Sequence, residues 1–313
     1  MINVGERTLT LNDFSNILFK KKQIVLDQVA VKKVNLNFKF LKNFSCNKLI
    51  YGINTGFGPM AQYKVDETNQ LQLQYNLIRS HSSGGGKLMS PIMVKAVMVA
   101  RLNSLMQAYS GVHTDVVELL TKLINSDVTP CIYEHGGVGA SGDLVQLAHL
   151  ALVLIGEGEV IYENEVHPTA KIFTKLKINP LAIHIREGLA ILNGTSAMTG
   201  IGMVNIIQAQ KLLEWSVMLS AMINEIVEAF DDHYSYELNI VKQHKGQNKI
   251  AAQLRHILKD SKMIRCRSEH LYNPENLDRL PRNRHHLRNS PVGGDLRQLA
   301  LDPSRRSYID RQR

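Results

Sequence analysis

The sequence predicts a mainly α-helical protein. Apolar residues recur every three or four positions over several long stretches, a spacing typical of helices with one buried face. The clearest stripes lie between residues 144 and 155 and between residues 198 and 230. With 313 residues, 44% of them hydrophobic, the chain can bury a substantial core in one large domain or two.

The individual elements follow from this spacing and from capping residues. The expected helices, in chain order, span about residues 11–19, 26–44, 71–82, 90–109, 114–124, 143–155 and 193–230, and one more begins near residue 244. Thr10 is expected to cap the first helix, and Ser90 with Pro91 to open the fourth, which Gly111 ends. Residues 160–165 are expected to form a short hairpin that turns at Glu163-Asn164.

Cysteine usage and the N-terminus indicate the compartment. The three cysteines, Cys46, Cys131 and Cys266, lie far apart without CxxC spacing, so neither a disulfide framework nor a zinc site is expected. The N-terminus has no apolar signal segment, and no apolar run is long enough to span a bilayer. We therefore expect a cytoplasmic protein without a membrane partner.

The composition changes near the C-terminus. Lysine is absent after Lys262, and residues 276–313 carry nine arginines and four aspartates, a net charge of +5 out of the +9 of the whole chain. This bias predicts a disordered tail. A nucleic-acid binder could use such a tail, but it holds one tyrosine, Tyr308, and no stacking platform, so nucleic acid is not an expected partner.

The most informative stretch is a glycine-rich loop over residues 134–144 that contains Ala140-Ser141-Gly142. A helix is expected to begin directly after it, with Asp143 as its N-cap. The triplet would then lie at a helix N-terminus, where free N–H donors and positive potential favour negative charge.

Such a triplet can build an electrophile from the chain itself. The amide nitrogen of Gly142, which has no Cβ in the way, can attack the carbonyl of Ala140 and close a five-membered ring. Ser141 can then lose its hydroxyl as water and leave a methylidene carbon. The alternative is a glycine-rich turn before a core helix, and three residues alone favour that alternative.

Further motifs accompany the triplet in a fixed order. They are Tyr51–Gly58, Leu77–His81, Arg101–Asn103, Tyr109–Val112, Gly137–Leu144 and Glu187–Thr195. Together they resemble the aromatic amino-acid ammonia-lyase family, which includes the histidine, phenylalanine and tyrosine ammonia-lyases and related aminomutases. The resemblance covers about residues 11–276. It implies the N-terminal half of the family's fumarase/aspartase-like helical fold, with the central helical bundle incomplete.

The resemblance also implies a prosthetic group and a set of site residues. Ala140, Ser141 and Gly142 would form 4-methylidene-imidazol-5-one (MIO), with no external cofactor and no metal. Tyr51 would be the catalytic base, although a packed loop tyrosine remains the alternative, and Gly58 would line the substrate site. Ser80 and His81 would contact the substrate ring. Asn193, which is also expected to cap the long helix after it, would hold the MIO group and the substrate carboxylate in register.

The substrate is a small aromatic amino acid. Ser80-His81 argues against phenylalanine, because a Phe-Leu pair is typical of phenylalanine enzymes. Residues 142–147, 193–198 and 60–63 resemble a bacterial tyrosine ammonia-lyase branch, whereas Ser80-His81 is shared with histidine enzymes. The predicted reaction is therefore elimination of ammonia from L-tyrosine to give 4-coumarate, and the alternative is elimination from L-histidine to give urocanate.

The resemblance weakens toward the C-terminus. After His244–Gln247, the family continues with a Tyr-Ser-Leu-Arg-Cys stretch that Met263–Arg267 does not match. We divide the chain into an MIO-bearing domain over residues 1–195, the start of the central bundle over residues 196–275 and the Arg-rich tail over residues 276–313. Family members are homotetramers whose sites draw residues from three subunits. We therefore expect impaired activity or, alternatively, an inactive fragment without turnover.

Overall fold

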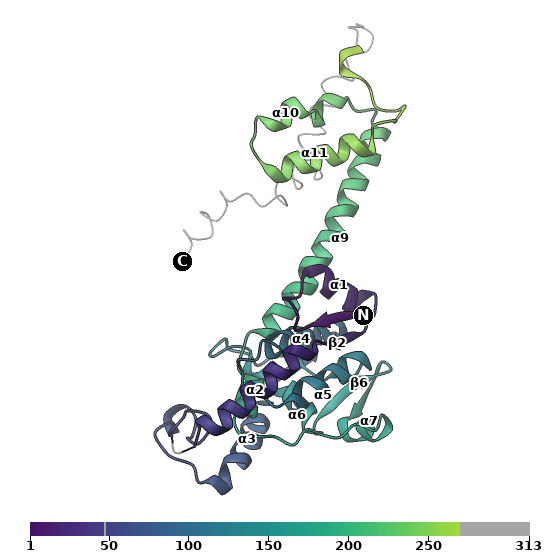
Figure 1. The fold of residues 1–313 in the computed structure, drawn as a ribbon. Coiled ribbons are helices and arrows are strands. Elements are labelled where there is room, and N and C mark those ends of the chain that lie inside the picture. The colour runs from purple at the N-terminus through teal and green to yellow at the C-terminus, as the bar shows by residue number, and fades with distance from the viewer. Residues whose placement is uncertain (47, 270–313) are drawn as a thin grey trace. The chain divides into compact units, whose positions relative to one another are not determined.

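The described part of the protein is mainly helical, as predicted. The computed structural model describes residues 1–46 and 48–269, which form eleven α-helices and seven short strands (Figure 1). These residues divide into two compact units, Met1–Ile207 and a second unit that begins at Gln208. The Arg-rich tail lies outside the described residues. None of the described helices combines the length and apolarity that a membrane span requires.

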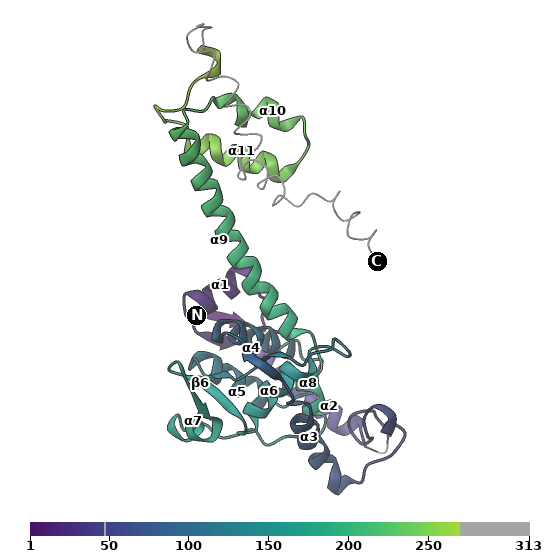
Figure 2. The ribbon, with the colours of Figure 1, turned by 180° about the vertical axis from the view of Figure 1, so that it is seen from behind.

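The first unit is a helical core with small sheets at its edges. Its helices are α1 (Leu11–Phe19), α2 (Gln28–Phe44), α3 (Glu67–His81), α4 (Pro91–Leu105), α5 (Thr114–Asn125), α6 (Leu144–Leu154), α7 (Thr169–Lys175), α8 (Glu187–Leu192) and the first turns of α9 (Ser196–Ile226). Helix α4 is buried along most of its length and packs against α5. Helices α3, α6 and α8 pack against one another (Figure 2).

Short strands close the edges of this unit. They form a parallel pair of β1 (Ile2–Val4) and β2 (Ile24–Leu26), an antiparallel pair of β3 (Gly85–Leu88) and β5 (Tyr133–His135), and an antiparallel sheet of β4 (Thr129–Pro130), β6 (Glu159–Tyr162) and β7 (Glu165–Pro168). The predicted hairpin is confirmed as β6 and β7. Glu163 and Asn164 adopt φ values of 55° and 66°, as a two-residue hairpin turn with positive φ at both positions requires.

The second unit is smaller and has a small core. It contains the rest of α9, α10 (Tyr236–Ile240), α11 (Lys245–Ile257) and the 3₁₀ turns Asp231–Tyr234 and Arg267–Glu269. The last α-helix begins after His244, as predicted. Its buried apolar cluster consists of Ala221, Tyr234, Ala251 and Leu258.

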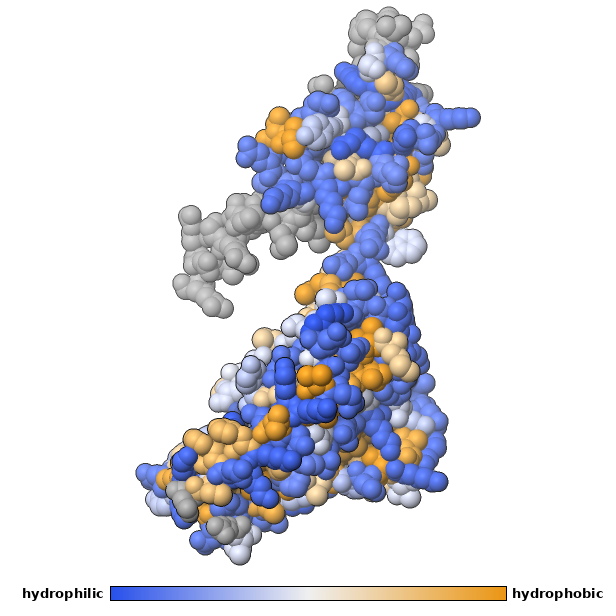
Figure 3. All heavy atoms as spheres, in the orientation of Figure 1, coloured by the Kyte–Doolittle hydropathy of each residue, from blue (hydrophilic) through white to orange (hydrophobic). Residues whose placement is uncertain are grey.

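Several apolar side chains remain exposed on the chain. On α9, Leu212 and Trp215 are 70% and 68% exposed. On α2 and just after it, Leu36, Phe40, Phe44 and Leu49 are also exposed, and apolar patches appear in this region at the lower left of Figure 3. The chain therefore presents apolar surface on more than one helix.

One helix end differs from the prediction. Helix α4 ends at Leu105 instead of reaching Tyr109. Ala108 adopts a φ of 62°, a left-handed conformation that interrupts the helix three residues before Gly111. Apolar spacing could not reveal this stop, because Ala is the strongest helix former.

The first helix begins with the cap that the sequence predicts. The Thr10 side chain accepts a hydrogen bond from the Asp13 amide, and the Asp13 carboxylate accepts one from the Thr10 amide, which is a capping box. Arg7 donates two hydrogen bonds to the same carboxylate. The Arg7 guanidinium and the Thr10 donors hold the pKa of Asp13 well below its usual range.

We expect Asp13→Asn to lower the free energy of unfolding at pH 7 by about 1 kcal/mol, the typical worth of a helix cap. Because the folded-state pKa is depressed, the carboxylate stabilises the fold above its unfolded pKa, and this contribution is lost as pH falls below about 4. Thermal unfolding between pH 7 and pH 2 should therefore show a flatter acid dependence in this variant. The control is Glu118→Gln on the exposed face of α5; equal acid slopes for the two variants would contradict the assignment.

Candidate active site

The Ala140-Ser141-Gly142 triplet lies on an exposed loop. The end of this loop is hydrogen-bonded to Gly194, which lies between α8 and α9. Ser141 and Gly142 adopt φ values of 62° and 101°. Gly142 forms an isolated parallel bridge with Gly194, and the amide of Asp143 donates to the Gly194 carbonyl at 2.8 Å. A Cβ on residue 142 would lie 2.3 Å from that carbonyl oxygen. Glycine is therefore required at position 142 both by its φ value and by the space around it.

Asp143 stands at the N-cap position of α6, as predicted, but its side chain makes no hydrogen bond to that helix. Its carboxylate instead accepts from the Met198 amide at 2.8 Å. Because Met198 lies in the first turn of α9, Asp143 caps a helix that is distant in sequence. The prediction that Asp143 caps its own helix is wrong in this respect.

Asn193 also has a different role from the predicted one. It is the C-terminal cap residue of α8, and its side-chain amide donates to the Leu189 carbonyl at 3.1 Å, so it does not cap α9. The next residue, Gly194, is the one that pairs with Gly142. Asn193 is thereby held beside the point where the triplet loop is attached.

A buried arginine, which the sequence analysis placed in a motif without assigning it a role, holds this point in place. Arg101 on α4 is 3% exposed and donates from Nη2 to the carbonyls of Ala190 and Asn193, the latter at 2.7 Å. A Cβ on Gly194 would lie 2.4 Å from Nη1 of Arg101. Burial lowers the pKa of Arg101 to about 10, while Asp143 opposes this shift. The signal that could have assigned it this role is an arginine within the apolar run of α4.

Tyr51 lies on a loop of turns that is attached to α8 through a buried glutamine. Its side chain is 53% exposed, and its hydroxyl accepts a long hydrogen bond, 3.4 Å, from the Gly58 amide at the start of a 3₁₀ turn (Gly58–Met60). The carbonyl of Gly52 accepts from Nε2 of Gln74 at 3.3 Å, and Oε1 of Gln74 accepts from the Leu189 amide at 3.2 Å. Gln74 is fully buried and was not identified from the sequence.

Ser80 and His81 form the end of α3, the helix that also carries Gln74. Ser80 Oγ donates to the Leu77 carbonyl at 3.1 Å, and His81 Nδ1 lies 2.9 Å from the same oxygen. Nδ1 also lies 3.1 Å from Ser80 Oγ. A carbonyl oxygen can only accept, so the tautomer that satisfies the Leu77 carbonyl carries its proton on Nδ1 and keeps Nε2 as an acceptor. His81 therefore presents an acceptor nitrogen.

These residues are connected through the main chain of α8 and the residues directly after it. Gly142 meets Gly194, Asn193 follows Leu189 within one helical turn, and Gln74 joins Leu189 to the loop of Tyr51. The hydrogen bonds thus link the triplet, Asn193 and the Tyr51 loop indirectly. They do not join the Tyr51 hydroxyl or the His81 ring to the triplet directly.

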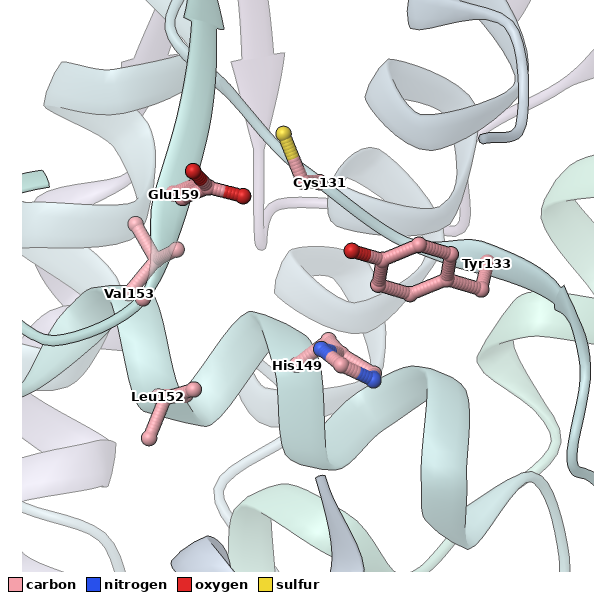
Figure 4. Close-up of a pocket in the computed structure, with 7 residues that line it drawn as sticks. Cys131, Tyr133, His149, Leu152, Val153 and Glu159 are labelled. Atoms are coloured by element: carbon pink, nitrogen blue, oxygen red, sulfur yellow. The ribbon is translucent and has the colours of Figure 1, made fainter. Parts of the chain in front are cut away.

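A separate cavity of about 110 Å³ is lined by none of the predicted site residues. Figure 4 shows Tyr133, His149, Cys131 and Glu159 around it. His149 Nε2 accepts from the Gly84 amide at 3.1 Å, and burial lowers the pKa of the imidazole. Burial raises the pKa of Cys131 to about 11, so its thiol stays protonated and unreactive. We interpret this cavity as a packing feature.

The chain is similar in sequence to known enzymes. The family model for aromatic amino acid lyases matches residues 9–294. The chain is 39% identical over 270 residues to the histidine ammonia-lyase of Shouchella clausii, covering 86% of this chain and 54% of that protein. It is 36% identical over 265 residues to a probable histidine ammonia-lyase of Thermoplasma volcanium, covering 84% and 54%.

A solved structure shares the fold. The tyrosine aminomutase of Streptomyces globisporus superposes with a TM-score of 0.81 at 30% identity, covering 91% of this chain and 53% of that one. The chain thus spans about half the length of the relatives it matches.

Proposed function

Because the chain belongs to the aromatic amino acid lyase family, we propose that it carries the electrophile-forming part of a histidine ammonia-lyase site, which converts L-histidine to urocanate and ammonia. The names of the curated relatives favour histidine, and they do not support the tyrosine specificity that the sequence motifs predicted. The observation that carries the proposal is the attachment of the Ala140-Ser141-Gly142 loop to Gly194, directly beside Asn193.

The triplet fits the MIO group that the family implies. Ser141 and Gly142 already have left-handed backbone conformations, and Gly142 packs against the Gly194 carbonyl without room for a Cβ. This supports ring closure between residues 140 and 142. When formed, the group supplies an electrophilic carbon for the substrate amino group, which makes ammonia a better leaving group.

The remaining proposed roles belong to side chains around α8. Asn193 would position the substrate carboxylate, and Gly58 would line the substrate site on the loop of Tyr51. Tyr51 would remove the β-proton as a general base. The connection from Gly52 through Gln74 to Leu189 supports this role, because it ties the loop of Tyr51 to the helix that ends at Asn193.

His81 is the proposed reader of the substrate ring. The hydrogen bond of Nδ1 to the Leu77 carbonyl leaves Nε2 as an acceptor. An acceptor can bind the N–H of an imidazole or the O–H of a phenol, but it gains nothing from the phenyl ring of phenylalanine. The side chain therefore supports histidine or tyrosine over phenylalanine, and the relatives favour the first.

We also propose that turnover requires more protein surface than one chain provides. Ala140 and Ser141 are exposed, and Tyr51 is 53% exposed, whereas proton abstraction by a phenol needs a site that excludes water. The exposed apolar residues of α9, such as Leu212, Trp215 and Ile226, are available to pack against other copies in a homotetramer. The chain by itself should therefore release ammonia slowly.

Ammonia release from histidine, tyrosine and phenylalanine tests this proposal. We expect histidine to have the highest kcat/KM, at a rate below that of the Shouchella clausii enzyme assayed in parallel. His81→Leu should lower kcat/KM for histidine by about 10–100-fold, because the substrate N–H loses its acceptor. His256→Leu on α11 is the matched control and should change little. A higher kcat/KM for tyrosine than for histidine would return the assignment to tyrosine.

A further inference from the structure

A cluster of potential metal ligands lies on the first unit, apart from the proposed catalytic residues. His113, just before α5, and His184, in the segment before α8, have ring centroids 5.0 Å apart. One nitrogen from each ring and one carboxylate oxygen of Asp115 all lie within 4.8 Å of one another. We propose that His113, His184 and Asp115 bind one zinc-class divalent cation, a role that goes beyond the proposed lyase function.

The donor set selects the class of ion. Two imidazoles and one carboxylate are typical of zinc sites that keep a fourth position open, whereas Ca²⁺ and Mg²⁺ prefer oxygen ligands. Neighbouring ligands of a tetrahedral zinc with bonds of about 2 Å are about 3.3 Å apart. His113 Nδ1 and Asp115 Oδ2 are already 3.1 Å apart. The ligand atom of His184 lies within 4.8 Å of both others and completes the set of three.

A buried carboxylate positions both histidines. Glu187 is fully buried, and its two oxygens accept hydrogen bonds from the amides of His113 at 2.7 Å and His184 at 2.6 Å. The two segments, which are far apart in sequence, are therefore aligned by one residue.

The surroundings restrict the rings without blocking them. Phe38 on α2 packs against both imidazoles, with centroid distances of 5.0 Å to His113 and 5.3 Å to His184. His113 Nδ1 also accepts the cap hydrogen bond from the Asp115 amide at 3.3 Å, which is long. An ion that competes for Nδ1 therefore displaces only a weak interaction. The apolar wall and the shared carboxylate make the arrangement a built site, whereas surface histidines usually lack such support.

Binding would have a structural consequence. The ion would join the N-terminus of α5 to the segment that leads into α8. Helix α8 ends at Leu192, next to Asn193. A cation at its start would therefore stabilise the helix on which the proposed catalytic residues depend, and it should raise the unfolding temperature whether or not the chain is a lyase.

Isothermal titration of the untagged, chelator-treated chain with ZnCl₂ tests the site. We expect one ion per chain and a rise in Tm on addition of zinc. His184→Ala should weaken the affinity at least tenfold. His113→Asn should do the same while keeping a residue that can cap α5, so a loss of affinity would not reflect a lost helix start. The matched control, His256→Ala, removes an exposed histidine from α11 and should bind like the unmodified chain.

A second measurement separates the site from loose surface binding. Co²⁺ in the same site should give the intense visible absorption of a four-coordinate ion, and this absorption should disappear in His113→Asn and His184→Ala. Zinc affinities equal to that of His256→Ala in both variants would overturn the proposal. Only the weak spectrum of six-coordinate Co²⁺ in the unmodified chain would overturn it as well.

Discussion

Ser141→Ala is expected to abolish formation of the electrophile and, with it, all turnover. In the unmodified chain, a peptide spanning residues 134–149 should be lighter than its sequence mass by two water molecules. One water derives from the Ala140 carbonyl oxygen when the Gly142 nitrogen attacks, and the other from the Ser141 hydroxyl. Without that hydroxyl the variant can lose at most the first water, and no methylidene carbon forms.

The Ser141→Ala variant removes the reacting hydroxyl without disturbing the fold. Ser141 lies on the exposed loop with a φ of 62° and already carries a Cβ, so alanine introduces no new backbone strain. Gly142→Ala is a poorer test, because its Cβ would lie 2.3 Å from the Gly194 carbonyl oxygen and would disturb the attachment itself. Ser104→Ala on the exposed part of α4 serves as the matched control and should keep the two-water deficit.

The result discriminates between two states of the chain. A two-water deficit in the unmodified chain that Ser141→Ala removes would mean that the described fold suffices for ring closure. An unmodified chain of full sequence mass would show that compression of the loop needs surface from elsewhere, and the proposed electrophile would then be absent from the isolated chain. Histidine turnover by Ser141→Ala at the rate of the unmodified chain would contradict the role of the triplet altogether.

Local pattern was sufficient for much of the fold. The apolar stripes of α6 and α9, the Thr10 cap and the turn at Glu163-Asn164 all depend on neighbours in sequence, and all are present. The loop that carries the triplet was also predictable, because its glycines indicate a turn before a helix. These features are properties of short segments, so a single sequence contains their signal.

The side-chain hydrogen bonds at the candidate site, in contrast, were not predicted correctly from local sequence patterns. Asp143 was expected to cap α6 but accepts from Met198 on α9, and Asn193 was expected to cap α9 but ends α8. In both cases a polar side chain that precedes one helix forms its hydrogen bond with a residue of another helix. Spacing cannot reveal the partner of Asp143, because Met198 lies 55 residues away in sequence. Asn193 donates to the Leu189 carbonyl four residues back, at the end of α8.

Buried polar residues are the other features that spacing could not assign. Gln74 sits on α3 among residues of mixed polarity, where a solvated glutamine is the ordinary expectation, yet it is fully buried between Gly52 and Leu189. Glu187 is fully buried for a similar reason, since its oxygens accept from the distant amide of His113 and from the nearby amide of His184. Burial of this kind is decided by the partners that other segments provide.

Arg101→Gln is expected to destabilise α8 by about 2–4 kcal/mol. The guanidinium donates to two carbonyls, those of Ala190 and Asn193, and a hydrogen bond from a charged donor contributes about 1.5–3 kcal/mol. Part of that loss is offset, because the substitution also removes a buried charge and an Nε atom that has no partner within the described residues. The net effect remains destabilising, since two part-buried carbonyls lose their donor.

Hydrogen–deuterium exchange of the α8 amides is the suitable measurement. The single tryptophan, Trp215, lies in the second unit and does not report on this helix. The amides of Leu189 and Asn193 should exchange faster in the variant, by a factor that rises exponentially with the lost opening free energy. Arg79→Gln is the matched control, because Arg79 forms a two-bond ion pair with Glu157 in which both side chains are more than 40% exposed. Exposed pairs contribute about 0–1 kcal/mol, so α8 should exchange normally in this variant.

If Arg101 positions the triplet loop, its substitution should also reduce formation of the electrophile. A loss of stability alone does not predict this effect. At a temperature where both variants remain folded, the fraction of chains with the two-water deficit should fall in Arg101→Gln and stay unchanged in Arg79→Gln. The reason is that Arg101 holds Asn193 and contacts Gly194, the residue against which Gly142 is pressed. Arg101→Lys should recover only part of the deficit, because an ammonium cannot reproduce the fork of a guanidinium. If Arg101→Gln matures as completely as the unmodified chain while α8 exchanges faster, then the arginine stabilises the helix without shaping the triplet.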